Sequence, residues 1–381
     1  MPEQLPESYL AVLKQAEDFV AQEIVPRGER LGLGEPLTKL GAEVRVASKQ
    51  AGFFYKTQPK AFGGDPAGAL ELTMLREYWA GVNSELTRFI FGPGPGLLHE
   101  ATGELARQFL EPVMAGEKRG AFGFTEPDNA PRPTWAVLAN DELTLNGQKS
   151  YVTGGDSADF LSILVNVEDP LGAKLGTAMV VVDRGAQGVM LQDTFTSMEG
   201  GGHAAFRFEG VKVPSWQIIG NLGEGMPRAL ANIGNVRLMV AAEAMGMSLW
   251  ALDYLNQHLL APHRTGGSLG DKEGVRLRYA ELRIQAFAGR SVLYRAARRA
   301  DDSGNSVNEV IAAKVFCTEA QDRFDWNLVG KKTMLIPHNN SRMGDLGAAE
   351  KITSSRNFVD PSLYRYEDGE VAIVEATLKA G

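Results

Sequence analysis

The spacing of hydrophobic residues changes twice along the chain. From residue 7 to about residue 114, hydrophobic positions recur every three to four residues, which predicts amphipathic helices. Between Gly120 and Gly220 they fall in short runs separated by turn sequences, which predicts β-strands. The helical spacing returns at residue 226. This order predicts an α+β protein with three domains, covering residues 1–120, 121–222 and 223–381.

Individual elements can be placed within each block. Pro26 is expected to end the first helix and Gly52 the second. The predicted helices cover residues 7–25, 37–51, 68–80, 226–261, 271–302 and 305–335. The predicted strands cover residues 134–138, 142–145, 149–153, 160–167, 177–183 and 204–213.

Composition narrows the class of protein. The formal net charge of -8 and the lack of a basic run argue against a nucleic-acid-binding protein. We expect no membrane span, because no apolar stretch approaches the about 18 to 20 residues that one needs. The N-terminus has no signal-peptide pattern, and Cys317 is the only cysteine, so a reducing, cytoplasmic location is expected. The five histidines lack zinc-ligand spacing, so we expect no metal site. Neither a GxGxxG dinucleotide fingerprint nor a P-loop occurs.

The stretch that carries candidate chemistry runs from Phe122 to Gly155. It includes Phe124-Thr125-Glu126-Pro127 near its start and Tyr151-Val152-Thr153 near its end. Each part is a β-prone run that ends in a threonine beside a turn former, so two strand ends would present hydroxyls next to an aromatic ring. A planar heterocycle could bind there, with hydroxyls at its polar edge and the ring against its face. On these residues alone, an ordinary hairpin edge is the favoured interpretation.

The order of these motifs resembles the flavin-binding middle domain of the acyl-CoA dehydrogenase family. Thr-Glu-Pro is followed by Leu-Asn-Gly-x-Lys and then by an aromatic residue with Val-Thr. The resemblance implies FAD as cofactor, with Thr125 at the pyrimidine edge of the flavin, Tyr151 on the ring system and Thr153 near N5. Phe124 and Val152 belong to the same cofactor-binding motifs. Trp is usual where Tyr151 stands. The implied fold is an N-terminal helical domain, a middle β domain and a C-terminal four-helix bundle.

The resemblance places the catalytic carboxylate near the C-terminus. Arg365, Asp368 and Gly369 match the family's Arg-x-x-Glu-Gly segment, with Asp in place of Glu. Asp368 is therefore the expected base and Glu367 the competing candidate. An acidic turn before a final helix would explain the same residues without catalysis.

The first long helix offers further candidates. Some relatives carry a catalytic Glu there, but the matching position is Val236, and Glu243 two turns later is a weak substitute. Arg237 matches a family arginine near the pantetheine end of the substrate, although an ordinary ion pair would explain it equally well. Arg237 and Gly369 are the expected substrate-binding residues.

Two family segments that reach a neighbouring subunit's flavin are altered here. Arg264-Thr265-Gly266-Gly267-Ser268 lacks the phenylalanine of the first. Asn327–Thr333 keeps Gly330 but has Lys331 and Thr333 where the second has glycines. A homo-oligomer would therefore offer each flavin one intact and one damaged half-site. An α2β2 heterotetramer with a related chain would repair this. The alternative is a homotetramer or homodimer that binds flavin weakly, or through Lys331 and Lys332.

Together these features predict FAD-dependent α,β-dehydrogenation of an acyl-CoA thioester, with electrons passing to an electron-transferring flavoprotein. A ring-bearing or branched acyl group fits as well as a linear one. One rival is a non-catalytic partner subunit of an acyl-CoA dehydrogenase complex, which the altered motifs favour. The other is a flavin oxidase or monooxygenase on the same fold.

Replacing Asp368 by Asn tests the expected base. If Asp368 removes the α-proton, acyl-CoA should no longer bleach the flavin of the variant without oxygen, because an amide cannot accept that proton. Anaerobic visible absorbance measures the bleaching. Unchanged bleaching would exclude Asp368, and Glu367→Gln then tests the competing candidate.

Overall fold

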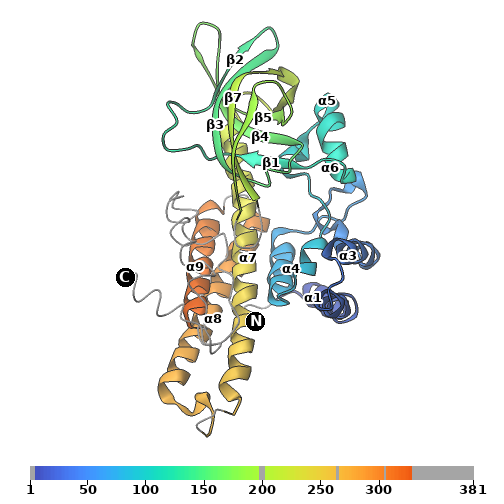
Figure 1. Ribbon diagram of the computed structural model, residues 1–381, viewed down its shortest axis with the longest axis vertical. Coiled ribbons are helices and arrows are strands. Elements are labelled where there is room, and N and C mark those ends of the chain that lie inside the picture. Colours follow the sequence, from blue (N-terminus) through green and yellow to red (C-terminus); the bar gives the residue numbers. More distant parts are fainter. Residues whose placement is uncertain (1–4, 197–201, 263–265, 304–305, 328–381) are drawn as a thin grey trace. The chain divides into compact units, whose positions relative to one another are not determined.

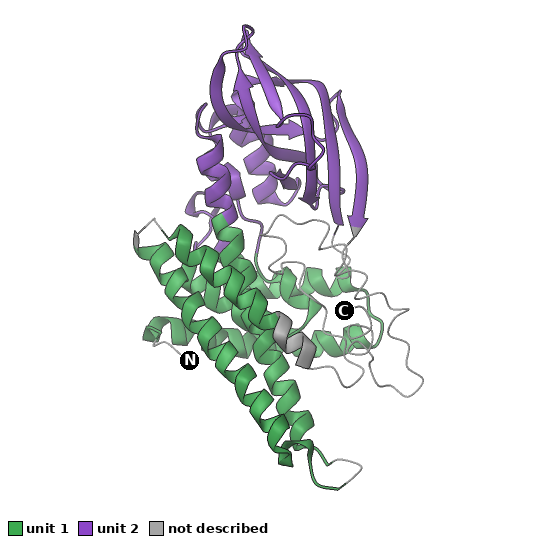
Figure 2. Cartoon of the chain, turned by 90° about the vertical axis from the view of Figure 1, so that its left-hand side faces the viewer, with its two compact units in different colours: residues 1–56, 67–91, 234–381 green, residues 57–66, 92–233 purple. Residues whose placement is uncertain are grey.

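The structure is a computed structural model that describes residues 5–196, 202–262, 266–303 and 306–327 (Figure 1). The chain divides into two compact units (Figure 2). Unit 1 comprises residues 1–56, 67–91 and 234–381, and unit 2 comprises residues 57–66 and 92–233. The boundaries expected at residues 120 and 222 follow the changes between helices and strands. The compact units instead group residues 92–120 with the strands.

The described part of unit 1 is helical. Its N-terminal helices are α1 (Glu7–Phe19), the π-helical turn η1 (Val20–Ile24), α2 (Val25–Gly32), α3 (Leu37–Ala51) and α4 (Ala69–Gly81). Its C-terminal helices are most of α7 (Gly225–Leu260), together with α8 (Glu273–Ser303) and α9 (Val307–Asn327). These agree with the three long C-terminal helices predicted from the sequence. A fourth helix of the expected bundle would fall outside the described residues.

The first helical segment continues past Pro26, so the prediction that Pro26 ends it is wrong. Pro26 lies in the first turn of α2, where the missing backbone N–H is tolerated, and η1 joins that turn to α1. Gly52 does end α3. Its φ of 86° is the left-handed conformation that glycine adopts without a steric penalty.

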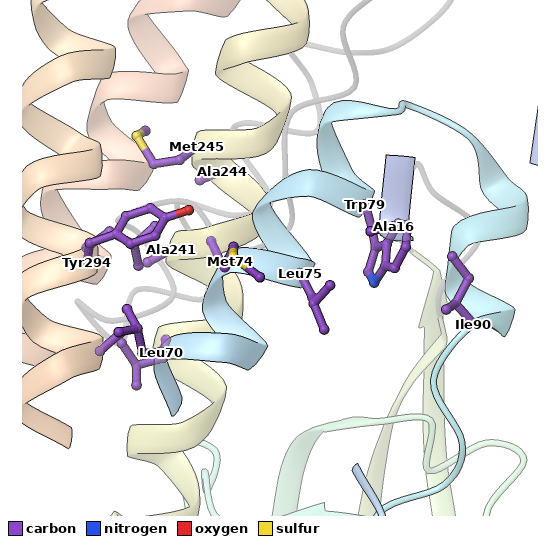
Figure 3. Close-up of a cluster of buried hydrophobic side chains, with 14 of the residues drawn as sticks. Ala16, Leu70, Met74, Leu75, Trp79, Ile90, Ala241, Ala244, Met245 and Tyr294 are labelled. Carbon is purple, nitrogen blue, oxygen red and sulfur yellow. The ribbon is translucent and has the colours of Figure 1, made fainter. Parts of the chain in front are cut away.

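Helix α4 packs against α7 and α8 in the core of unit 1. Figure 3 shows Leu70 and Met74 of α4 beside Tyr294 of α8 and Met245 of α7. Close approach of α4 and α7 requires Gly246, since a Cβ there would lie 2.1 Å from the carbonyl oxygen of Glu77. By length and composition α7 could cross a membrane, but 61% of its apolar window is buried inside the protein, as in a core helix.

A buried ion pair joins α4 to α8. Glu77 is 3% exposed, and Arg290 donates to its two carboxylate oxygens from Nε at 2.7 Å and from Nη2 at 2.8 Å. The Tyr294 hydroxyl donates to the same carboxylate at 2.6 Å. Burial raises the pKa of Tyr294, and the Glu77 charge raises it further, so the hydroxyl remains a donor. The carboxylate of Asp301 on α8 accepts from the backbone N–H groups of Ala69 and Leu70 and so caps α4.

Unit 2 is built on a mixed sheet with short helices. The strands are β1 (Gly120–Gly123), β2 (Trp135–Ala139), β3 (Glu142–Thr153), β4 (Phe160–Glu168), β5 (Lys174–Asp183), β6 (Val189–Thr196), β7 (Gly202–Pro214) and β8 (Ile218–Ile219). The helices include α5 (Gly103–Leu105) and α6 (Glu111–Ala115). The sheet order is β6-β7-β3-β2-β4-β5-β8, and β1 pairs with β4. β1 and β2 run parallel to β4, and the other pairs are antiparallel.

Two features of the sheet differ from the sequence prediction. β3 is one continuous strand where two were predicted, because Gly147 at a φ of 137° carries the chain past the expected break. β6 and β8 were not predicted. β6 carries Gln and Asp among its apolar residues, which hides its alternation, and β8 has only two residues.

The ion pair between α4 and α8 can be tested by removing one partner. Glu77→Ala would leave the Arg290 guanidinium buried without this carboxylate, which should lower the free energy of unfolding by about 3–5 kcal/mol. Glu85→Ala, which removes an exposed partner of Arg88, should have little effect. Urea denaturation compares the two variants. Equal, small effects would contradict the importance of the buried pair.

Candidate functional site

Three predicted cofactor-binding residues, Thr125, Tyr151 and Thr153, lie close together in unit 2, and we name them the hydroxyl rim. Thr125 follows β1, and its carbonyl accepts the N–H of Ser150 at 2.8 Å, so the Thr125 loop lies beside β3. Tyr151 is the next residue on β3, and Thr153 is the last residue of that strand. All three are exposed, Tyr151 by 38%. The rim is therefore accessible to a ligand.

A β-bulge sets the orientation of the rim. Between Lys149 and Val152, β3 contains one residue more than its partner β7, and Tyr151 has a φ of 56°. Strict alternation from the buried Lys149 would bury Tyr151 and Thr153 and expose Val152. The bulge reverses this, since Val152 is fully buried and Thr153 is exposed. The left-handed backbone at Tyr151 is unfavourable by about 1–3 kcal/mol and is typical of functional sites.

A buried ion pair holds the Thr125 loop against β3. Lys149 is 1% exposed, and its Nζ donates to Glu126 Oε1 at 2.6 Å and to the Phe124 carbonyl at 3.2 Å. Glu126 Oε1 also accepts the backbone N–H of Thr134 at 3.0 Å. Burial lowers the pKa of Lys149, and the Glu126 carboxylate opposes that change. Glu126 thus supports the site rather than lining it.

The other two predicted cofactor-binding residues have inward-facing side chains. Val152 is part of the sheet's hydrophobic core. Phe124 is half-buried, packs against a neighbouring core and stacks on Phe122 with ring centroids 6.0 Å apart. Their side chains pack into the interior of unit 2 beneath the rim.

Two residues not predicted from the sequence adjoin the rim. Phe195 of β6 lies 5.1 Å from the Tyr151 ring, centroid to centroid, and stacks on His203 of β7 at 6.1 Å. His203 Nδ1 lies 3.1 Å from Thr153 Oγ1. If β6 had been predicted as a strand, the sequence could have indicated Phe195 as a candidate residue of the site.

The rim's chemistry fits a planar heteroaromatic ligand. Each threonine hydroxyl can donate one hydrogen bond and accept others, and the neighbouring rings offer flat apolar faces. A flavin has a matching polar edge and flat face, so these residues fit the cofactor that the resemblance implies. Within the described ranges, no group of three His, Cys, Asp or Glu side chains could hold a metal ion.

The remaining candidates lie elsewhere. Arg237 and Glu243 are half-buried on α7 in unit 1. Burial lowers the pKa of Arg76, and the nearby Glu243 carboxylate opposes that shift. Cys317 is fully buried on α9, and burial raises the pKa of its thiol, which fits a packing role.

Several predicted positions lie outside the described residues. These are Arg264, Thr265, Lys331, Lys332, Arg365, Glu367, Asp368 and Gly369. Of the first altered interface segment, Gly266 and Gly267 have φ values of 82° and 69°, and the Ser268 N–H donates to Asp271 at 2.6 Å.

Comparisons with known proteins agree with the fold. Residues 223–324 match the family model described as acyl-CoA dehydrogenase, C-terminal domain. The CarC subunit of the caffeyl-CoA reductase-Etf complex of Acetobacterium woodii is 26% identical over 318 residues, which are 81% of this chain and 83% of CarC. Residues 223–324 thus match the acyl-CoA dehydrogenase family, and most of the chain is similar to its members at low identity. Members of this family bind FAD, and its reductases and dehydrogenases are oxidoreductases.

Two further likenesses support the same family. The 3-(aryl)acrylate reductase of Clostridium sporogenes is 26% identical over 324 residues, which are 82% of this chain and 85% of the reductase. The structure of butyryl-CoA dehydrogenase from Megasphaera elsdenii superposes with a TM-score of 0.67 at 23% identity, and the match covers 92% of this chain and 91% of that chain. The fold of the chain is thus that of the acyl-CoA dehydrogenases.

A second match concerns the C-terminal segment. Residues 300–381 match a model described as a protein of unknown function, DUF1329. The two matches overlap at residues 300–324, and the acyl-CoA dehydrogenase match ends there. Asp368, Glu367 and Gly369 lie beyond that end, so their roles stay predictions.

The role of the Lys149–Glu126 ion pair in holding the hydroxyl rim can be tested by replacing each partner in turn. Glu126→Ala would leave a buried ammonium without its carboxylate and release the Thr125 loop, so unfolding should become easier by about 3–5 kcal/mol. Lys149→Met removes the buried charge, and the Glu126 side chain, 22% exposed, keeps access to water, so the cost should be below about 2 kcal/mol. Chemical denaturation gives both values. The account is wrong if the Lys149 variant is the less stable one.

Proposed function

We propose that this chain is an FAD-dependent oxidoreductase that acts on the Cα–Cβ bond of an acyl-CoA thioester. The observation that carries the proposal is the hydroxyl rim. The three residues at family flavin positions come from two separate motifs, and they meet at one exposed edge with their side chains outward. The function therefore rests on a local arrangement of this chain as well as on its relatives.

Each residue of the rim has a distinct role in this proposal. The Thr125 hydroxyl meets the pyrimidine edge of the flavin, and the Thr153 hydroxyl meets the region of N5. The Tyr151 ring covers the ring system and limits access of water. When bound, FAD supplies a hydride acceptor for the substrate β-carbon. Asp368, or Glu367 in its place, would take the α-proton, and Arg237 would lie toward the pantetheine end of the substrate.

The relatives bear on the substrate and the electron partner. CarC belongs to a caffeyl-CoA reductase complex with Etf, and the Clostridium sporogenes enzyme is a reductase of aryl acrylates. We therefore propose a ring-bearing acyl group, an electron-transferring flavoprotein as partner and a reaction that can run as dehydrogenation or as reduction. The low cysteine content supports a cytoplasmic location.

Assembly with a second, related chain is part of the proposal. The altered Gly266–Ser268 segment would make poor contacts with the flavin of a neighbouring subunit. A heterotetramer is therefore expected in place of a homo-oligomer. Helix α8 also exposes three large hydrophobic residues on one face, which suits burial against another subunit: Leu277 by 60%, Ile284 by 64% and Phe287 by 61%.

A non-catalytic partner subunit is the second candidate. The specific observation in its favour is that the acyl-CoA dehydrogenase match ends at residue 324, before the expected base. Such a subunit could keep the rim and bind flavin, yet fail to transfer a proton. Flavin binding and flavin reduction therefore have to be measured separately.

The first measurement is of FAD binding, and the quenching of flavin fluorescence is the signal that reports it. Thr125→Val and Thr153→Val should each weaken FAD binding by about two- to tenfold, because each removes one hydrogen bond to the ring. The matched control is Thr144→Val on the same strand, whose hydroxyl accepts from Lys212 and which should bind FAD normally. No FAD binding, with the chain alone or co-expressed with a related chain, would overturn the proposal.

The second measurement is anaerobic bleaching of the bound flavin by acyl-CoA thioesters. The proposal expects bleaching without oxygen uptake, fastest with a saturated ring-bearing acyl group. FAD that binds tightly but is never reduced would favour the non-catalytic subunit. If oxygen rapidly reoxidises the bleached flavin and the enzyme turns over with oxygen as acceptor, an oxidase would be favoured.

A further inference from the structure

Thr153, His203 and Phe195 form a cross-strand row at one end of the sheet. Thr153 of β3 is directly opposite His203 of β7, and His203 is directly opposite Phe195 of β6. Directly opposed residues share a face of the sheet, and the next row, Val152 and Ala204, is fully buried on the other face. The row is therefore on the outer face, where the hydroxyl rim is exposed.

The contact between His203 and Thr153 limits what the threonine hydroxyl can do. A hydroxyl has one proton to donate, and His203 Nδ1 lies 3.1 Å from Thr153 Oγ1. When Nδ1 carries no proton, the hydroxyl donates to it and offers a ligand only its lone pairs. When Nδ1 carries a proton, it donates to Oγ1, and the hydroxyl proton becomes available to a ligand acceptor.

We propose that His203 is a positioning residue that sets the hydrogen-bond direction of Thr153 and so makes flavin binding depend on pH. The inference rests on the proposed function, because the ligand acceptor is a ring nitrogen of the oxidised flavin. Histidine is the side chain whose charge ordinarily changes between about pH 5 and 8. With the proton of neutral His203 on Nε2, oxidised FAD should bind more tightly as pH falls through the ordinary histidine range, since protonation of Nδ1 frees the Thr153 proton for donation.

The surroundings of His203 include both charged and aromatic groups. On β3 and in the turn after it are Tyr151 and Asp156, and a Cβ on Gly202 would lie 2.5 Å from the Asp156 carboxylate. On β6, Phe195 stacks on the imidazole, and Asp193 lies two residues earlier. Arg207, four residues further along β7, is paired with Glu209. The Asp156 carboxylate thus lies beside Gly202, the residue before His203.

The experiment measures FAD affinity of the full chain across the histidine titration range, from about pH 5.5 to about pH 8.5. The wild type should bind oxidised FAD about two- to tenfold more tightly at the acidic end, the size expected for one hydrogen bond. His203→Asn keeps an amide near the Nδ1 position but cannot titrate, so its profile should be flat. Thr153→Val keeps the His203 imidazole but removes the hydroxyl, so its profile should also be flat, with weaker binding throughout.

The other outcomes separate the two proposals. If His203→Asn flattens the profile and Thr153→Val does not, His203 does not act through Thr153, and the positioning role is overturned. If FAD binds and all three proteins keep one pH profile, the inference fails while the proposed function stands. If FAD binds at no pH, either to the chain alone or to the chain co-expressed with a related chain, the proposed function fails and the role of His203 fails with it. Ring-nitrogen NMR of His203 without flavin gives an independent check, since Thr153→Val should shift its titration.

Discussion

The candidate site depends on the buried ion pair between Lys149 and Glu126. The pair ties the loop after β1 to β3, and Glu126 also holds the segment before β2 through the Thr134 N–H. Loss of Glu126 is the costly change, because it would leave the ammonium of the buried Lys149 without a carboxylate, whereas Glu126 is 22% exposed. The glutamate between Thr125 and Pro127 therefore has a structural task, namely to fix the backbone that presents the neighbouring threonine.

The β-bulge adds a second constraint to the same strand. Lys149 and Val152 are both buried, yet the regular alternation of side chains along a strand would place them on opposite faces of the sheet. The extra residue solves this and turns Tyr151 outward through an unfavourable backbone conformation. Burial of Val152 and the Ser150–Thr125 hydrogen bond offset that strain. The exposed tyrosine ring is thus a consequence of how the core of unit 2 is packed.

The sequence predicted those features that depend on neighbours along the chain. The β-prone runs placed Thr125, Tyr151 and Thr153 near strand ends, and the resemblance to the acyl-CoA dehydrogenase family made them cofactor candidates. Phe195 and His203 could not, because their place beside the rim depends on the pairing of β6 with β7 and of β7 with β3, which periodicity does not reveal.

Local rules also failed where the backbone accommodates a residue that usually ends an element. Pro26 interrupts a helix in isolation, yet a π-helical turn before it lets the segment continue. Gly147 looks like a turn residue, but in β3 it only bends the strand. The catalytic base is a different case. Asp368 and Glu367 were assigned from a short motif in a segment that the acyl-CoA dehydrogenase match does not reach.

The central claim is that the hydroxyl rim binds the flavin ring, and a structure of the chain with FAD tests it most directly. The account predicts the ring system against Tyr151, with the hydroxyls of Thr125 and Thr153 within hydrogen-bond distance of its polar atoms and His203 still in contact with Thr153. A flavin bound elsewhere on the chain, with the rim open to solvent, would contradict the account.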